Sequence, residues 1–442
     1  MTTAATKRMC ELKAGDVVRI VKFKYDPISM VNGLVPPVED DWLSIVADYS
    51  KTGGSILSCG VDKAGKPVSR ISSYAAHHEV EKLTLSEKSL EEWQKRGRAE
   101  LASNAAIFLA KGYGPSGSDP EIFVRGGDGE IMPAWTFLPD KKNPLLHKNA
   151  SSATWTSAFY DGYQAEFTLP ANGCHDNLMR TIQHGLQAVL NEAQKKDPKA
   201  HLDWTPYVEI PPGIMSKQTT EHNGLGCSPS KSAYGEEALK VDDPSQLAAR
   251  FTGCHMHFGW SSVMGSKPAA NVVKRMDAIY GIVATSLLDG IDNPRRRLFY
   301  GKAGEYRTPK HGLEYRTPSS AILAHPVLTY LNFDLARLVG YDYLGGNLLS
   351  GWAVPGGEDQ VREVINSGDA KTARKIIGIN IKLLTAVLNK LYREEHKKVV
   401  SLIEGGAVNF LPLRVKDFQT NWTSPRFTQV YNWKMKTGTA TT

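Results

Sequence analysis

The stretch Gly117-Ser118-Asp119-Pro120-Glu121-Ile122-Phe123-Val124 has an alternating polar and apolar pattern. Because successive side chains of a β-strand point to opposite faces of the sheet, Asp119 and Glu121 share one face, and Ile122 and Val124 share the other. The pattern predicts a strand with two carboxylates on one side and a hydrophobic core on the other.

Three later segments repeat this arrangement, with two polar or charged residues two positions apart in an apolar run. The pairs are Gln164 and Glu166, His255 and His257, and Glu314 and Arg316. One such pair is usually only a satisfied structural pair or a solvated face. Four of them indicate one sheet whose concave face is lined by Asp119, Glu121, Glu166, His255, His257, Glu314 and Arg316.

Several carboxylates packed together repel one another unless a cation lies among them. Oxygen ligands with an occasional imidazole suit Mg²⁺ or Mn²⁺ better than zinc. Arg307 and Arg316 are the arginines expected to hold phosphate, whereas the run 295–297 is also compatible with salt bridges at a helix end. The chain has no P-loop, Rossmann or kinase motif, so a nucleotide must be held by the sheet.

Amphipathic helices are expected to cover the apolar face of this sheet. Apolar residues recur at helical spacing around 178–189, 272–287 and 377–391. The predicted fold class is therefore α+β, with a curved antiparallel sheet lining the site and helices on its outer face.

Short β-rich runs separated by turn residues before residue 84 predict a small SH3-like all-β barrel over residues 1–83, interpreted as a docking or packing module. Ser89 and Glu92 have the spacing of a capping box and predict a linking helix over 84–115. The catalytic domain is expected over 116–418, followed by a basic polar tail over 419–442.

The charge distribution argues against a general nucleic-acid-binding surface. The 442 residues carry a net charge of +7, but residues 371–442 carry +9 and residues 1–370 carry −2. Five scattered cysteines, no apolar run long enough for a membrane helix and no signal-peptide pattern favour a cytoplasmic location without membrane contact.

The segment Tyr300-Gly301-Lys302-Ala303-Gly304-Glu305-Tyr306-Arg307, followed by Gly312-Leu313-Glu314-Tyr315-Arg316-Thr317, resembles phage-encoded carboxylate–amine ligases. These amidoligases belong to the glutamine synthetase and glutamate–cysteine ligase superfamily. The three earlier segments occur in the order that the superfamily requires, and the resemblance spans about 117–326. It implies a glutamine-synthetase-like fold and, for a phage protein, the host cytoplasm.

The resemblance also implies roles for individual residues. Asp119, Glu121 and Glu166 would bind the first metal, and His255 and Glu314 the second. His257 would lie near the nucleotide, Arg316 would contact the phosphate or the acyl substrate, and Arg307 would contact phosphate. Asp119 stands where glutamine synthetases usually carry glutamate, which leaves the number and spacing of the metals open.

The implied reaction uses ATP and Mg²⁺ or Mn²⁺ to join a carboxylate to an amine through an acyl phosphate. The substrates would be small molecules, peptides or proteins, with a protein partner bound through the N-terminal barrel as a further option. Two alternatives remain open: a phosphotransferase of the guanidino-kinase kind on the same sheet, and a non-enzymatic scaffold with a basic C-terminus that binds nucleic acid or a partner.

Overall fold

The computed structural model describes residues 3–8, 17–19, 43–50, 53–61, 67–75, 79–84, 116–147, 155–169, 175–223, 230–235, 243, 247–259, 268–310, 312–342, 348–392, 396–411, 413 and 422. The predicted linking helix lies outside these residues, as does the predicted tail apart from Trp422. Among the described residues, no helix combines the length and apolar character needed to cross a bilayer.

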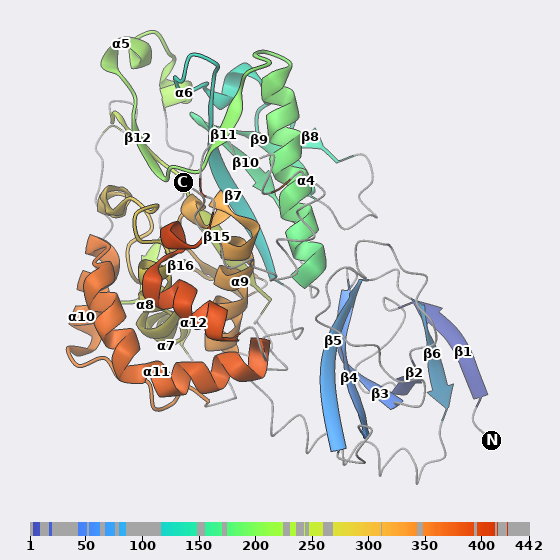
Figure 1. Cartoon of the computed structure of the whole chain (residues 1–442). Coiled ribbons are helices and arrows are strands. Elements are labelled where there is room, and N and C mark those ends of the chain that lie inside the picture. Colours follow the sequence, from blue (N-terminus) through green and yellow to red (C-terminus); the bar gives the residue numbers. More distant parts are fainter. Residues whose placement is uncertain are drawn as a thin grey trace, which may run out of the picture.

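The described N-terminal strands form one antiparallel sheet. They are β1 (Thr3–Arg8), β2 (Val17–Arg19), β3 (Leu43–Ser50), β4 (Gly53–Val61), β5 (Pro67–Ala75) and β6 (Glu79–Thr84). Their order is β1-β6-β2-β3-β4-β5 (Figure 1). A barrel requires its two edge strands to pair, and no pairing joins β1 to β5 among the described strands. The short strands are confirmed, but the predicted barrel is not found.

A second antiparallel sheet of nine strands carries the residues singled out above. Its strands are β7 (Ser116–Arg125), β8 (Leu145–Leu146), β9 (Ser157–Asp161), β10 (Gln164–Thr168), β11 (His201–Asp203), β13 (Lys231–Ser232), β15 (Cys254–Phe258), β16 (Glu305–Arg307) and β17 (Leu313–Tyr315). The order is β13-β16-β17-β15-β7-β10-β9-β8, and β11 pairs with the end of β7. This arrangement confirms the four strands expected from the alternating segments.

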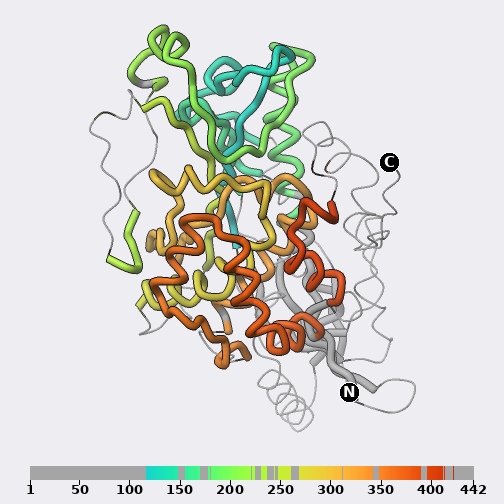
Figure 2. The backbone as a smooth tube through the Cα atoms, turned by 60° about the vertical axis from the view of Figure 1, so that its left-hand side comes forward, coloured from blue at the N-terminus to red at the C-terminus, as the bar shows by residue number. Residues whose placement is uncertain are grey.

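Helices lie between these strands in the chain and also follow the last of them, β17. They are η2 (Ala134–Thr136), α4 (His175–Gln194), α5 (Pro212–Met215), α6 (Thr220–Asn223), α7 (Ala269–Met276), the π-helical η5 (Asp277–Gly281), α8 (Ile282–Leu287), η6 (Pro294–Leu298), η7 (Ser320–Ala324), α9 (Pro326–Tyr341), α10 (Gly357–Ser367), α11 (Ala370–Tyr392), α12 (His396–Gly405) and η10 (Ala407–Asn409). A separate two-stranded antiparallel sheet pairs β12 (Tyr207–Glu209) with β14 (Ala249–Phe251). In Figure 2 most of the cyan and green segments lie above the yellow to red ones.

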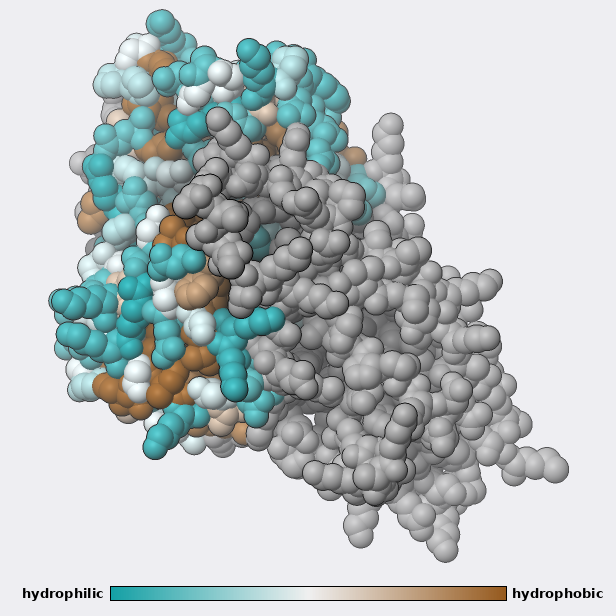
Figure 3. Space-filling view, viewed as in Figure 1, coloured by the Kyte–Doolittle hydropathy of each residue, from teal (hydrophilic) through white to brown (hydrophobic). Residues whose placement is uncertain are grey.

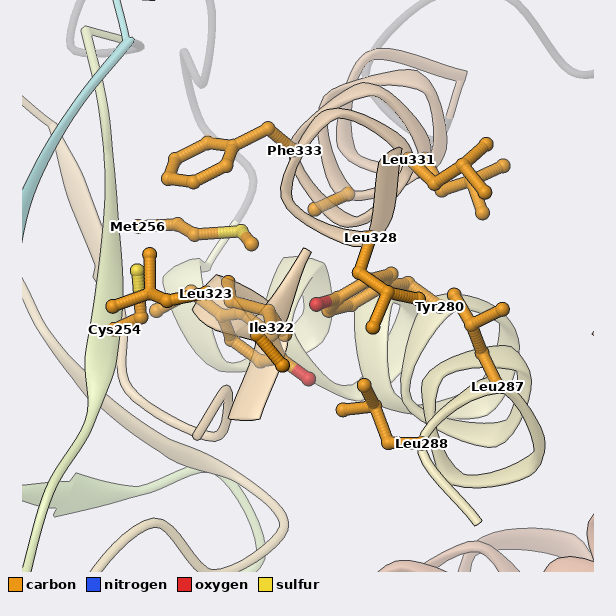
Figure 4. Close-up of a cluster of buried hydrophobic side chains, with 14 of the residues drawn as sticks. Cys254, Met256, Tyr280, Leu287, Leu288, Ile322, Leu323, Leu328, Leu331 and Phe333 are labelled. Carbon is orange, nitrogen blue, oxygen red and sulfur yellow. The ribbon is translucent and has the colours of Figure 1, made fainter. Parts of the chain in front are cut away.

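One face of the nine-stranded sheet packs against helices, as predicted. Cys254 and Met256 point from β15 toward Leu323 and Phe333 (Figure 4), and all four side chains belong to one buried hydrophobic core. The helical stripes predicted around 178–189 and 272–287 lie in α4 and in α7–α8, with their apolar residues buried in the same core. The α+β class and the large antiparallel sheet with its helices are confirmed.

Helix α11 contains the most regular of the predicted stripes and much of the excess positive charge. Ile377 and Leu388 are buried, whereas Lys371, Lys375 and Lys382 are exposed. Figure 3 shows hydrophilic side chains with apolar ones between them over α10 and α11. These three lysines therefore lie on the solvated side of an amphipathic helix.

Trp422 is the described residue of the 419–442 segment, and it is fully buried. Its indole Nε1 donates to the carbonyl oxygen of Leu323 at 2.9 Å, and its own carbonyl oxygen accepts from Gln183 of α4. A tryptophan from the predicted polar tail thus completes the packing between α4 and η7.

Candidate active site

The face of the sheet opposite the helices brings together every residue that the sequence predicted for the site. Directly opposite residues in an antiparallel pair project to the same face. The cross-strand pairs on this face are, in order along the sheet, Arg307 with Glu314, Glu314 with His257, His255 with Asp119, and Glu121 with Glu166. Arg316 follows β17 and reaches the same face, since its Nη1 donates to Glu314 Oε1.

Asp119, His257 and Glu314 form a group that we call the imidazole cluster. Their potential ligand atoms all lie within 4.8 Å of one another. His257 Nε2 lies 3.0 Å from Asp119 Oδ1, and His255 Nδ1 lies 3.3 Å from the same oxygen. Two carboxylates and a nitrogen at this spacing could hold a divalent cation.

Histidines control the charge of this cluster. Burial by itself raises the pKa of Asp119, but His255 and His257 outweigh burial and bring that pKa well below its ordinary value. Burial and the nearby Arg316 lower the pKa of His255 to about 4, so this imidazole is neutral at pH 7. Burial also opposes protonation of His257, but the hydrogen bond and charge of Asp119 prevail and raise its pKa.

Two arginines contact Glu314 of the imidazole cluster. Arg307 Nη1 lies 3.3 Å from Glu314 Oε1, the oxygen that also accepts from Arg316. The Arg316 side chain is only 2% exposed, whereas that of Arg307 is 27% exposed. An anion placed beside Glu314 would therefore meet one buried and one accessible guanidinium.

Glu121, Asp161 and Glu166 form a second group, the acidic cluster. Their carboxylate oxygens also lie within 4.8 Å of one another. Each oxygen of Glu121 has a donor, because the Tyr300 hydroxyl lies 2.7 Å from Oε1 and the Gly253 amide nitrogen 2.7 Å from Oε2. These two donors hold the Glu121 carboxyl in one orientation.

Burial and mutual repulsion oppose ionisation of the carboxyls in the acidic cluster. Burial first, and then the charge of Asp161, raise the pKa of Glu121 to about 8. Burial, followed by the charges of Asp119 and Glu121, raises the pKa of Glu166 well above its ordinary value. The nearest ammonium, Lys141 Nζ, is 4.0 Å from Glu166 and 72% exposed, so it compensates weakly. A bound divalent cation would allow these carboxyls to ionise together.

The donor set of both clusters fits a hard divalent cation. The acidic cluster offers only oxygens, and the imidazole cluster offers two carboxylates and one nitrogen. Beside them lie two buried polar atoms, Gln164 Oε1 and His255 Nε2, that have no hydrogen-bond partner among the described residues. A hydrated ion or a polar substrate could satisfy such atoms.

The structure groups the predicted ligands differently from the resemblance. It places Asp119 with His257 and Glu314, whereas the resemblance implied Asp119 with Glu121 and Glu166. His255 packs behind Asp119, and it is His257 that completes the group of three. The individual roles of these residues stay predictions.

Sequence reasoning did not assign Asp161 as a ligand. Asp161 and Gly162 lie where a tight hairpin joins β9 and β10, with Gly162 at a φ of 60°. Asp161 is the cross-strand partner of Gln164, which places it on the face of Glu166. An Asp-Gly pair just before the Gln-x-Glu strand was the available signal.

Tyr300 is a second residue of the site that sequence reasoning did not single out. Its hydroxyl contacts Glu121, and its ring packs against those of Phe251 and His255 at centroid distances of 5.0 and 5.3 Å. The available signal in the sequence was the position of Tyr300 at the start of the 300–307 motif.

The arginine run 295–297 is structural, in line with the alternative considered for it. Arg295 pairs with Glu209 at 2.6 Å, and Arg297 pairs with Asp292 at 2.5 Å. Arg296 is fully buried and donates to the carbonyl oxygens of Tyr300 and Thr317. In the loop near Lys141, Asp140 Oδ1 accepts from two backbone amides of its own turn.

A family model matches the part of the chain that contributes the histidines, the arginines and Glu314 to this site. Residues 238–406 match the family described as phage phiEco32-like COOH-NH2 ligase-type 2. The matched segment contains His255, His257, Arg307, Glu314 and Arg316, and the strands with the remaining acids precede it. No curated protein matches the chain. Over residues 238–406 the chain is therefore similar to this family of carboxylate–amine ligases.

Proposed function

We propose that the protein joins a carboxylate to an amine at the expense of ATP, through an acyl phosphate, with Mg²⁺ or Mn²⁺ bound by the two clusters. A carboxylate oxygen of the substrate attacks the γ-phosphorus of ATP, and ADP leaves. The amine nitrogen then attacks the acyl carbon, and inorganic phosphate and a proton are released as the amide forms. The substrate is an amino acid, a peptide or a protein terminus.

The observation that carries this proposal is the juxtaposition of two carboxylate clusters with two arginines on one sheet face. Joining a carboxylate to a triphosphate brings together two anions, which a protein must neutralise. Divalent metals bound there would offset that charge and polarise the γ-phosphoryl group. The acids of both clusters have the spacing and the oxygen donors for this purpose.

The chain's own residues have three tasks in the proposed reaction. Glu121, Asp161 and Glu166 bind one ion, and Asp119, His257 and Glu314 bind the other. Arg316 and Arg307 donate to the phosphoryl oxygens as charge develops during transfer, since both guanidinium groups already lie beside Glu314. His255 stays neutral and supports Asp119.

Hydroxylamine provides the test. With ATP, Mg²⁺ and a panel of amino acids and peptides, the protein should release ADP and form a hydroxamate, because hydroxylamine traps an acyl phosphate. Glu166→Gln should abolish both products while the protein remains folded by circular dichroism. Phosphorylated substrate that yields no hydroxamate would instead support a phosphotransferase, and no ADP release with any substrate would refute the ligase reaction.

A further inference from the structure

Tyr300 lies where the acidic and imidazole clusters meet. It is 4% exposed, and its hydroxyl donates to Glu121 Oε1 at 2.7 Å. The Arg316 guanidinium lies 5.2 Å from the centre of its ring, and the His255 ring lies at 5.3 Å with an interplanar angle of 64°. One side chain thus contacts a member of the acidic cluster and two residues that hold the imidazole cluster.

The backbone of Tyr300 is itself held firmly. Its amide donates to the carbonyl oxygen of Arg296 at 2.8 Å, and the buried Arg296 guanidinium donates back to the Tyr300 carbonyl oxygen at 3.2 Å. The same guanidinium donates to the carbonyl oxygen of Thr317, just after β17. The ring of Phe251 stacks on that of Tyr300 at 5.0 Å. The phenol is therefore anchored to β17 and β14 before it reaches Glu121.

We propose that Tyr300 is a positioning residue for both clusters: its hydroxyl orients Glu121 for metal binding, and its ring orients Arg316 for the nucleotide phosphates. This inference rests on the proposed metal and ATP sites. Hydrogen bonds to ligating carboxylates commonly change metal affinity by about 10- to 100-fold. A guanidinium over an aromatic ring contributes less, equivalent to about 2- to 30-fold in affinity.

The two contacts can be separated by two substitutions. Tyr300→Phe removes the hydroxyl and keeps the ring under Arg316, whereas Tyr300→Leu removes both. Tyr280→Phe is the matched control, because Tyr280 is similarly buried at 2% and its hydroxyl donates to a core amide, Asn332 Oδ1, at 2.8 Å. The control also loses one buried hydrogen bond, so a general effect on folding would lower the melting temperature of both phenylalanine variants.

Mn²⁺ binding to the purified full-length protein is measured by electron paramagnetic resonance of the free ion, without ATP or substrate. Glu121→Gln and His257→Ala identify which bound ion belongs to which cluster. Tyr300→Phe should lower the affinity for the ion that Glu121→Gln no longer binds by about 10- to 100-fold. The affinity for the other ion should not change. Tyr280→Phe should bind both ions like the wild type.

Binding of the non-hydrolysable ATP analogue AMPPNP tests the ring. Tyr300→Leu should weaken it by about 2- to 30-fold relative to Tyr300→Phe. Equal Mn²⁺ affinity in Tyr300→Phe and the wild type would overturn the role of the hydroxyl, and equal AMPPNP affinity in the two Tyr300 variants would overturn that of the ring. A wild type without an ion sensitive to Glu121→Gln would refute the acidic cluster as a metal site, and the proposed function with it.

Discussion

Replacing Glu121 by glutamine should stabilise the metal-free protein while abolishing its activity. The pKa of Glu121 rises from an ordinary 4.5 to about 8, because burial and Asp161 disfavour its charge. Between these two pH values the folded protein holds a proton that the unfolded chain releases, so the free energy of unfolding falls as the pH rises. Each tenfold change in proton affinity corresponds to about 1.4 kcal/mol. Relative to its value at low pH, the free energy of unfolding therefore falls by about 3 kcal/mol at pH 7, and this fall approaches about 5 kcal/mol above pH 8.

Glutamine avoids this loss because it does not titrate. Its amide has the shape of the carboxyl, so its oxygen can accept from the Gly253 amide and its nitrogen can donate to the Tyr300 hydroxyl oxygen. The excess stability of Glu121→Gln over the wild type should therefore grow from near zero at pH 4.5 to several kcal/mol at pH 8.5.

Urea denaturation in the presence of EDTA at pH 5, 7 and 8.5 measures this difference. Glu130→Gln, at an exposed position, controls for the loss of a surface charge. Added Mg²⁺ should stabilise the wild type more than Glu121→Gln, because only the wild type keeps the complete acidic cluster. A difference between Glu121→Gln and the wild type that does not change with pH would refute the reasoning.

Three further substitutions test other parts of the site. Arg316→Lys should lower kcat/KM for ATP by about 10- to 100-fold, because an ammonium cannot replace the fork of a guanidinium; equal steady-state kinetics would contradict this. Gly253→Ala should reduce both activity and melting temperature, since the added Cβ would lie 2.8 Å from His255 Nε2; an unchanged melting curve would argue against this close packing. Asp277→Ala should lower the free energy of unfolding by about 1–3 kcal/mol in urea titrations, because the buried Tyr315 hydroxyl loses its acceptor at 2.5 Å. An unchanged free energy of unfolding would show that this hydrogen bond does not stabilise the fold.

The strands and their faces could be predicted because they follow from the two-residue period of a strand. In each alternating segment the polar members lie on the site face and apolar neighbours such as Ile122 and Met256 lie in the core. The helices could be predicted equally well, because their apolar residues recur at the helical period.

The grouping of ligands could not be predicted in the same way, because it depends on register between strands far apart in the sequence. His257 rather than His255 lies opposite Glu314, and no local pattern encodes that pairing. Asp161 joins the acidic cluster only through the hairpin register that sets it opposite Gln164. In the N-terminal sheet, likewise, turn residues indicate where strands end but not whether the edge strands meet.

Strand β7 supplies one acid to each cluster from alternate positions, and this makes the site sensitive to chain length. A single residue inserted before Asp119 would turn both acids toward the helices and bring Pro120 and Ile122 to the site face. Exchanging one acid for another leaves the direction of the side chain unchanged. We therefore expect variation among related ligases to replace side chains within β7, and to confine insertions and deletions to the loops that flank it.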